Sequence, residues 1–445
     1  MKTSRTHGLA ADTMLPESSL LIAPPPPRVH AAYIGIDWGD QKHAFCLRET
    51  HSGVLRKGTV TMKQIQEWVC ELRQKYAPGR LIVAMESHRG ALLYALAQHA
   101  DFIDLVMVPT RSAAEYRKAF CPSGAKADAP DAHSLLDMLY HHQDRFSIWQ
   151  PDDAPTRLMT ALCEMRRQTV DERTRLSNHL TARLKMAYPV ALDLCEAIAS
   201  NLGLDLLQRW PTMASLQAAR PEKLRQFFYL HHVRRKVQIE RRLELIAQAQ
   251  PLVTDPAVLE PLELDIKRLV NEMKALLPVL EEYDRRIAAA YTAHPDAAIF
   301  KSLPGAGPAL APRLLCALGS QRERWPNAGA LQTFSGLSPV IISSGKMHSV
   351  QVRRACPKYL RQTFHEFASS SIRYCQWARG YYAKLRAQGK AHHTALRSLA
   401  WRWVRIIWRI WQDHAVYNET TCLNDRKRYR EGGTTAAKVL AAGCE

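Results

Sequence analysis

The sequence predicts an α/β N-terminal domain with a mixed sheet flanked by helices, then a helical coiled-coil segment, then a mainly α-helical C-terminal domain. Between residues 31 and 150, short apolar runs typical of strands alternate with helical patterns. From residue 151 onward the apolar residues recur mainly at helical spacing. A chain of 445 residues is long enough for two or three domains.

The first 30 residues precede this pattern and end in four consecutive prolines, Pro24 to Pro27. Such a run favours an extended segment without a core. We therefore expect residues 1–30 to be a flexible lead with no chemistry of its own.

The domain of residues 31–150 begins with three strand patterns at hairpin spacing. We expect strands at residues 32–37, 43–47, 58–61, 81–85 and 104–108. Helices are expected at residues 63–76, 90–98, 112–120 and 130–141. Three hairpin strands followed by βα units are the order expected of an RNase H-like domain.

Residues 151–295 carry helical patterns throughout. Between Leu262 and Ile287 the apolar residues step alternately by four and three, which is a heptad seam. Pro278 lies inside this seam and is expected to kink or break the helix. An arginine-rich helix is expected from Leu158 to Leu184. Three arrangements remain open: a coiled-coil hairpin, a zipper between two chains, or packing inside an intramolecular bundle.

Residues 296–420 are predicted to form a second compact helical domain, followed by a loose tail at residues 421–445. Near its start, Leu303 to Gly307 resembles the turn of a helix-hairpin-helix element. Glycines let backbone N–H groups approach phosphate oxygens, so Gly305 and Gly307 are candidate nucleic-acid contacts. The alternative is a Pro-Gly turn that only reverses the chain.

The composition indicates a polyanionic partner. The chain has 61 Lys+Arg against 42 Asp+Glu, a net charge of +19. The alternative is a basic soluble protein without such a partner. The ten cysteines form no Cys-x-x-Cys pair, which disfavours zinc ribbons and favours reduced thiols. With no membrane-length apolar run and no signal pattern, we expect a cytoplasmic protein without a membrane partner.

Four acidic residues are the strongest sign of chemistry. Asp37 and Glu86 each end a predicted strand, and Asp128 and Asp131 open a predicted helix on one face. A single carboxylate in such a place is often a cap or a salt-bridge partner. Four converging carboxylates repel one another and need cations to stay ionised together. We therefore expect two divalent cations, Mg²⁺ with Mn²⁺ as the alternative, in a site suited to phosphodiester chemistry.

Two motifs near the C-terminus bear on nucleic acid. In Ser343-Ser344-Gly345-Lys346, composition alone favours a turn over a nucleophilic serine, and Lys346 is a candidate phosphate contact. The run from Arg397 to Trp411 places an apolar face opposite a basic stripe, formed by Arg402, Arg405 and Arg409. An amphipathic core helix explains this pattern, and its basic stripe is also suited to phosphate contacts.

In combination these residues resemble the insertion-sequence one-ten family of transposases, the bridge-RNA-guided recombinases. The resemblance covers nearly everything from Tyr33 to about Trp411. Its landmarks are residues 33–37, 85–87, 126–132, the arginine-rich helix ending near Leu184, residues 303–307, 336–346 and 382–396.

The resemblance implies a RuvC-like nuclease domain joined through a coiled coil to a helical transposase domain. By position, Asp37, Glu86, Asp128 and Asp131 would be its DEDD metal ligands. Ser344 would attack DNA and form a covalent phosphoserine. A noncoding bridge RNA would pair with donor and target DNA. Homo-oligomers, dimers or tetramers, would combine the nuclease domain of one subunit with the serine of another.

Three positions depart from the family pattern. Ser343 adjoins Ser344, so it is the alternative nucleophile. Arg353 and Arg354, candidate nucleic-acid contacts, precede an alanine where the family usually has glycine. Pro130 stands between the paired aspartates, which requires a helix start there.

Two rival functions remain. One is a RuvC-like, structure-selective DNA junction endonuclease with water as its nucleophile. The other is an inactive nucleic-acid-binding remnant, against which the presence of all four carboxylates argues.

Overall fold

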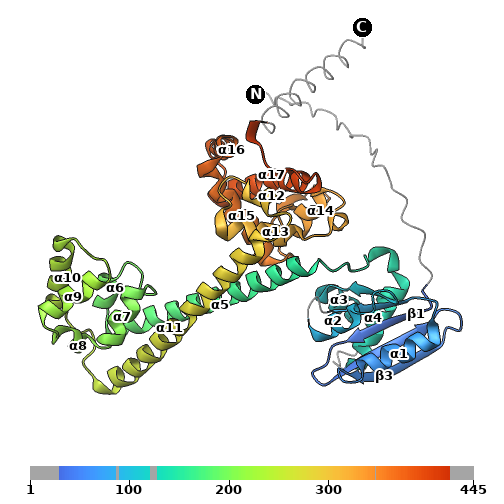
Figure 1. Ribbon diagram of the computed structural model, residues 1–445, viewed down its shortest axis with the longest axis horizontal. Helices are drawn as coiled ribbons and strands as arrows, with labels where there is room; N and C mark the ends of the chain where they lie inside the picture. The colour runs from blue at the N-terminus through green and yellow to red at the C-terminus, as the bar shows by residue number, and fades with distance from the viewer. Residues whose placement is uncertain (1–29, 87–89, 121–127, 346, 421–445) are drawn as a thin grey trace, which may run out of the picture. The chain divides into compact units, whose positions relative to one another are not determined.

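The computed structural model describes residues 30–86, 90–120, 128–345 and 347–420, with the side chains of Asp128 and Met347 left out of the description. The chain divides into two compact units, Met1–Gln150 and Pro151–Glu445. Each is described by itself (Figure 1).

The first unit is built on a five-stranded mixed sheet, as predicted. Its strands are β1 (Ala32–Asp37), β2 (Lys42–Glu49), β3 (Leu55–Thr61), β4 (Leu81–Met85) and β5 (Ile103–Met107). The strand order is β3-β2-β1-β4-β5, in which β1–β2 and β2–β3 are antiparallel and β1–β4 and β4–β5 are parallel. The sheet thus joins a three-stranded meander to two βα units, which confirms the predicted fold class.

Helices cover both faces of this sheet. They are α1 (Ile65–Tyr76), α2 (Ala91–Ala97), α3 (Thr110–Phe120) and α4 (Asp128–His141), followed by the short 3-10 helix η1 (Gln143–Arg145). The apolar residues of α1 and α2 share a core with Ile34, Ile36 and Val83 on one face. Those of α4 pack against Ile82 and Ala84 on the other. The alternation of strand side chains therefore assigns each face to its own helices.

Gly35 sets how closely α4 approaches the sheet. A Cβ built on Gly35 would lie 2.2 Å from the carbonyl oxygen of Ala132 and 2.4 Å from the backbone nitrogen of Leu136. Both atoms belong to the backbone of α4, so they cannot yield by rotating a side chain. The glycine lets the helix lie directly on β1, with its first turns near the strand end.

The second unit contains two long helices, α5 (Ala154–Ala187) and α11 (Pro256–Thr292), which lie side by side (Figure 1). They are antiparallel, because Arg183 pairs with Asp265 at 2.7 Å and Arg166 with Asp284 further along. Part of the heptad seam of α11 is buried beside leucines of α5 such as Leu180. This seam therefore packs within the chain. Of the two outcomes expected at Pro278, a kink or a break, the break is wrong, because α11 continues through this residue.

Five short helices connect α5 to α11. They are α6 (Val190–Leu194), α7 (Asn201–Arg209), α8 (Met213–Gln217), α9 (Pro221–Leu230) and α10 (Lys236–Gln248). Their buried side chains, Phe228 and Leu204 among them, form one core with the adjoining parts of the two long helices.

The C-terminal part of this unit is mainly helical, as predicted. It comprises α12 (Ala297–Lys301), α13 (Gly307–Leu318), η2 (Arg322–Arg324), α14 (Ala328–Phe334), β6 (Val340–Ser344), β7 (Met347–Gln351), α15 (Lys358–Tyr374), α16 (Gln376–Ala387) and α17 (His392–Gln412). Its core surrounds α17, whose Trp403 and Trp411 are fully buried. In the part of the chain that is described, no helix is both long and apolar enough to cross a membrane.

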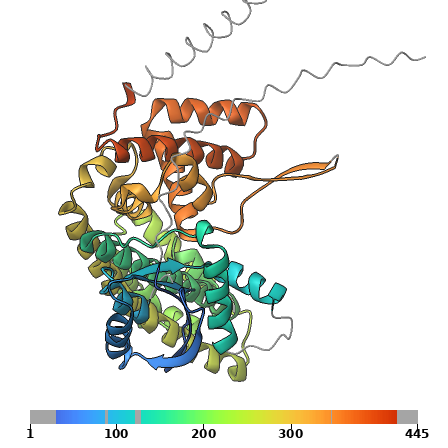
Figure 2. The ribbon, with the colours of Figure 1, turned by 90° about the vertical axis from the view of Figure 1, so that its right-hand side faces the viewer.

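The β6–β7 hairpin is an element that the sequence analysis did not anticipate. The run Val340-Ile341-Ile342 and the alternation around Val350 are strand signals, and a two-residue Gly-Lys loop between them favours a hairpin. The glycine of this loop has a φ of 54°, the left-handed region such a turn requires. Figure 2 shows the hairpin as an orange two-stranded ribbon projecting from the helices around it.

Candidate functional site

Asp37 and Glu86 lie at the same edge of the sheet. The parallel register of β1 and β4 pairs Ala32 with Leu81 and continues to Gly35 with Ala84. Extended by two residues, it brings Asp37 beside Glu86, which follows the last residue of β4. Both residues are partly buried. The two carboxylates predicted from separate strand ends therefore belong to one place in the fold.

The two carboxylates also share the face that α4 covers. Asp37 is two residues from Gly35, and Glu86 is two residues from Ala84, so each points to the same side as that neighbour. Asp131 on α4 directly precedes Ala132, the residue whose carbonyl contacts Gly35. The close approach at Gly35 thus positions the start of α4 against the acidic strand ends.

Arg117 of α3 is ion-paired with one of these carboxylates, that of Asp131. Its Nη1 donates to Oδ1 of Asp131 at 2.6 Å and to Oδ2 at 2.8 Å. The hydrogen bonds and charge of Asp131 raise the pKa of the Arg117 guanidinium, and the charges of Glu86 and Asp37 raise it further. One cation therefore lies within electrostatic reach of three of the four predicted acidic residues. Sequence reasoning missed Arg117, since a single arginine in a basic chain carries no distinguishing signal.

The donor set suits a hard divalent cation, because carboxylate oxygens are the ligands that Mg²⁺ and Mn²⁺ prefer. The ion pair with Arg117 balances the negative charge of one of these carboxylates, Asp131. Among the described residues, no three His, Cys, Asp or Glu side chains are grouped as metal ligands. The fourth predicted ligand, Asp128, opens α4, but its side chain lies outside the description. Pro130 falls within the first turn of α4, where proline is tolerated.

The two candidate serines lie near the end of the β6–β7 hairpin. The register pairs Ser343 with His348 and Ser344 with Met347. Adjacent strand residues point to opposite faces, so the two hydroxyls do too. The Oγ of Ser343 is 3.0 Å from Nδ1 of His348. His348 was not among the predicted residues, although its pairing could have been found once the hairpin was recognised.

The hydroxyl of Ser343 thus has a potential general base, whereas that of Ser344 has no hydrogen-bond partner among the described residues. Both serines are exposed. Lys346, the candidate phosphate contact of this motif, lies outside the described residues.

The two glycines at the start of α13 differ in their surroundings. Both have positive φ angles, 81° for Gly305 and 56° for Gly307. A Cβ on Gly305 would lie 2.8 Å from the ring of Tyr374, and Ser370 donates to its carbonyl at 2.7 Å. Gly305 therefore has a packing role against α15. Gly307 has open space around the position of a Cβ, which suits its predicted approach to a phosphate.

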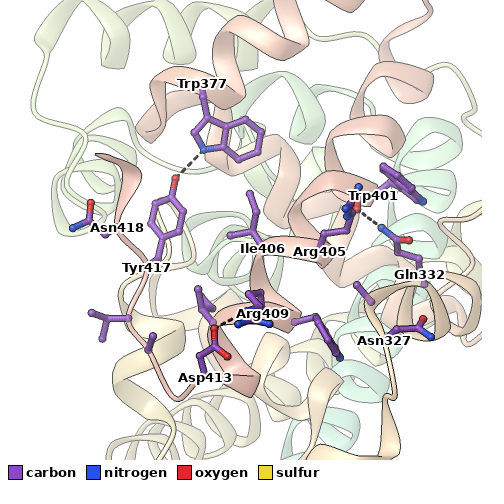
Figure 3. Close-up of a pocket in the computed structure, with 16 residues that line it drawn as sticks. Asn327, Gln332, Trp377, Trp401, Arg405, Ile406, Arg409, Asp413, Tyr417 and Asn418 are labelled. Carbon is purple, nitrogen blue, oxygen red and sulfur yellow. Dashed lines mark hydrogen bonds and ion pairs between the residues drawn. The ribbon is translucent and has the colours of Figure 1, made fainter. Parts of the chain in front are cut away.

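The predicted basic contacts fall into two groups. Arg354 is exposed after the hairpin, whereas the Nε of Arg353 is buried. On α17, the Arg402 guanidinium lies 4.2 Å from the ring centre of Tyr381. Arg405 and Arg409 are exposed and line a cavity of about 1020 Å³ (Figure 3). The carboxylates of Asp37, Glu86 and Asp131 belong to the first unit, whereas the candidate serines and the predicted basic contacts belong to the second.

Two family profiles match this chain. A DEDD-type transposase profile of insertion element IS110 matches residues 34–189. A profile described as transposase IS116/IS110/IS902 family matches residues 297–383. Together they cover more than half of the chain, including most of β1 and all of β4, α4 and the β6–β7 hairpin.

Individual proteins of insertion elements are also similar to this chain, over most of the length of both. The chain is 24% identical over 377 residues to a mini-circle putative transposase for IS117 from Streptomyces coelicolor, covering 82% of this chain and 90% of the relative. It is 26% identical over 391 residues to the 44.8 kDa protein of insertion element IS116 from Streptomyces clavuligerus, covering 86% and 96%. A 42 kDa protein of insertion element IS900 from Mycobacterium paratuberculosis is 28% identical over 335 residues, covering 74% and 81%.

Proposed function

Because the chain belongs to the IS116/IS110/IS902 family of transposases, enzymes that cut and join DNA, we propose that it moves its element by RNA-guided strand cleavage and exchange. The proposed chemistry uses a carboxylate metal site and a serine nucleophile. Two observations support it: the parallel register that brings Asp37 and Glu86 to one edge of the sheet, and the ion pair of Asp131 with Arg117, whose pKa the charges of Glu86 and Asp37 also raise.

Asp37, Glu86, Asp128 and Asp131 would hold two divalent cations, Mg²⁺ or Mn²⁺. Such cations would supply charge neutralisation to a phosphodiester as its bonds change. The sheet and α4 contribute rigid positions for the ligands. Arg117 contributes a competing cation, because it holds the oxygens of Asp131 that a metal would need.

The serine step is a transesterification. The serine Oγ forms a bond to phosphorus while the bond from phosphorus to a sugar oxygen breaks. The hydroxyl proton leaves the serine, and the departing sugar oxygen gains a proton. A sugar hydroxyl of a second strand then attacks the phosphoserine, which joins the new strand and restores the serine. No water is consumed, so the strands are exchanged rather than hydrolysed.

Ser344 is the proposed nucleophile by its position in the family pattern, and Ser343 is the alternative. The contact between Ser343 and His348 distinguishes the two candidate nucleophiles, because it places a histidine beside the hydroxyl of Ser343. If Ser344 attacks, His348→Gln should change the rate of adduct formation less than about tenfold. If Ser343 attacks with His348 as its base, the loss should be roughly 10²- to 10⁴-fold.

A protein–DNA adduct tests the covalent step. The full-length protein is incubated with labelled donor and target DNA, candidate RNA and Mg²⁺, then resolved under denaturing conditions. We expect a labelled adduct that Ser344→Ala abolishes. Ser349→Ala, which removes another serine of the same hairpin, serves as the matched control and should keep the adduct. Cleavage without any adduct would instead support the junction endonuclease, whose four carboxylates all lie within residues 37–131.

RNA guidance and oligomeric assembly complete the proposal. The net charge of +19 suits an RNA as well as two DNA partners. Strand exchange should therefore require the element's flanking RNA, and changing the guide segments should change the site that is cut. Composite active sites predict that an Asp37→Asn protein mixed with a Ser344→Ala protein regains activity that neither has alone. Failure to regain activity would place both halves on one subunit.

A further inference from the structure

A cavity of about 1020 Å³ lies beside the exposed face of α17 (Figure 3). Its lining comes from α14, α16, α17 and the segment that follows α17. The volume is at the upper end of the range usual for small-molecule sites, roughly 300–1,000 Å³. The aromatic residues in its lining are Trp377, Trp401, Trp408 and Tyr417.

Hydrogen bonds hold the rings of Trp377, Tyr417 and Trp408 in place, and another holds the backbone of Trp401. Trp377 donates its indole N–H to the hydroxyl of Tyr417 at 2.8 Å. Trp408 donates its own to the carbonyl oxygen of Trp325 at 3.0 Å. The amide of Gln332 donates to the carbonyl oxygen of Trp401 at 2.7 Å. Fixed rings lose little conformational freedom when a flat partner stacks on them, so the cavity is prepared for an aromatic ligand.

The charge at the cavity is positive. Arg409 is paired with Asp413 at 2.6 Å, so it is largely balanced. Arg405 has no ion-pair partner among the described residues, and its guanidinium lies 5.6 Å from the ring centre of Trp401. An aromatic ring with an unpaired guanidinium beside it matches a base with its phosphate, because rings stack on bases and arginine binds phosphate.

Two amide side chains add hydrogen-bonding groups to the lining. The Oδ1 of Asn327 accepts from the backbone of Ala330 at 2.9 Å, which leaves the NH₂ of Asn327 as a donor. The NH₂ of Gln332 is used at Trp401, which leaves its oxygen as an acceptor. A base edge carries both donors and acceptors. A purely apolar ligand would use neither these groups nor Arg405.

We propose that this cavity binds an unpaired nucleobase of a nucleic-acid strand, with the adjacent phosphate on Arg405. The proposal uses the transposase family only as the reason that nucleic acid is present, and it holds whether the nucleophile is Ser344 or Ser343. It adds a site at which the protein distinguishes an unpaired nucleotide from a continuous duplex.

Fluorescence of 2-aminopurine tests the proposal with the full-length protein. The probe is a duplex with one bulged 2-aminopurine, made as DNA in one arm and as RNA in the other. Stacking on a tryptophan should quench the fluorescence, and the bulged duplex should bind about 5- to 100-fold more tightly than one with an abasic residue at the bulge. The arm with the greater preference identifies the strand that supplies the base.

Arg405→Gln and Trp401→Leu should each reduce both the quenching and the preference for the bulge. Arg405 is exposed, so its substitution leaves the fold intact, and a thermal melt checks Trp401→Leu. Arg241→Gln on α10 removes an exposed arginine elsewhere and should lower the affinity for both duplexes equally. Equal binding of the bulged and abasic duplexes in both arms, or quenching unchanged in Arg405→Gln and Trp401→Leu, would overturn the proposal.

Discussion

The acidic edge of the sheet and the serine hairpin are the two proposed halves of one active site, yet they are built in opposite ways. The acidic edge consists of Asp37, Glu86 and Asp131, partly buried side chains at the ends of β1 and β4 and the start of α4. Its geometry depends on the backbone contact at Gly35. The hairpin is a local element whose Ile341 and Val350 are 70% and 72% exposed. The fold therefore positions the proposed metal half itself, whereas the proposed nucleophile half is positioned only by its own two strands.

The largest expected effect is at Asp37. Asp37→Asn keeps the shape of the side chain and removes its charge, so strand cleavage should fall on the order of 10²- to 10³-fold, as when other electrostatic groups of active sites are removed. The measurement is the initial rate of cleavage at saturating Mg²⁺. Asp40→Asn, an exposed change three residues away, is the control and should retain the rate. Full activity of Asp37→Asn would remove the acidic edge from the mechanism.

Gly35→Ala should disturb the acidic edge through the backbone. The added methyl would lie 2.2 Å from the carbonyl oxygen of Ala132, so α4 must move away from β1. Overpacking of this kind costs about 1–3 kcal/mol in the free energy of unfolding. Urea denaturation followed by circular dichroism measures it. The same change at Gly380 on α16, where a Cβ meets open space, should instead stabilise by about 0.5–1 kcal/mol. Equal effects at both glycines would contradict this role for Gly35.

Arg117→Gln should alter how the acidic edge responds to metal. Without the guanidinium, the carboxylates repel one another in the absence of a cation, so the melting temperature in EDTA should fall. Because the competitor for Asp131 is also gone, Mg²⁺ should bind more tightly and restore more of the melting temperature than in the unchanged protein. Calorimetric titration and thermal melts measure both. Arg111→Gln, an exposed arginine on the same helix whose ion pair is with Glu115, should show neither effect. Weaker Mg²⁺ binding by Arg117→Gln would mean that Arg117 supports the metal.

The same contrast explains what could be predicted from the sequence. The strand ends at Asp37 and Glu86 could be predicted from the sequence, because apolar runs stop there. The topology of the sheet then brings these strand ends together. The contact of Arg117 could not be predicted from the sequence, because it depends on how α3 lies beside α4. The cavity beside α17 was also hidden: periodicity identified the basic stripe, but the wall contributed by Trp377 and Tyr417 comes from other elements. Local patterns identify elements, whereas contacts between distant elements require the fold.

The smallest expected effect is on the stability of the hairpin, and the same substitution in the sheet provides the comparison. Val350→Thr on the hairpin replaces a methyl with a hydroxyl that water can hydrogen-bond, so the free energy of unfolding should change by less than about 0.5 kcal/mol. Val83→Thr makes the same chemical change in β4, where the side chain is fully buried, and should cost about 1–3 kcal/mol because the hydroxyl loses water. Urea denaturation of both variants gives the two values. A cost at Val350 as large as that at Val83 would show that the hairpin is packed in solution, and the contrast between a fold-positioned metal half and a self-supporting nucleophile half would then fail.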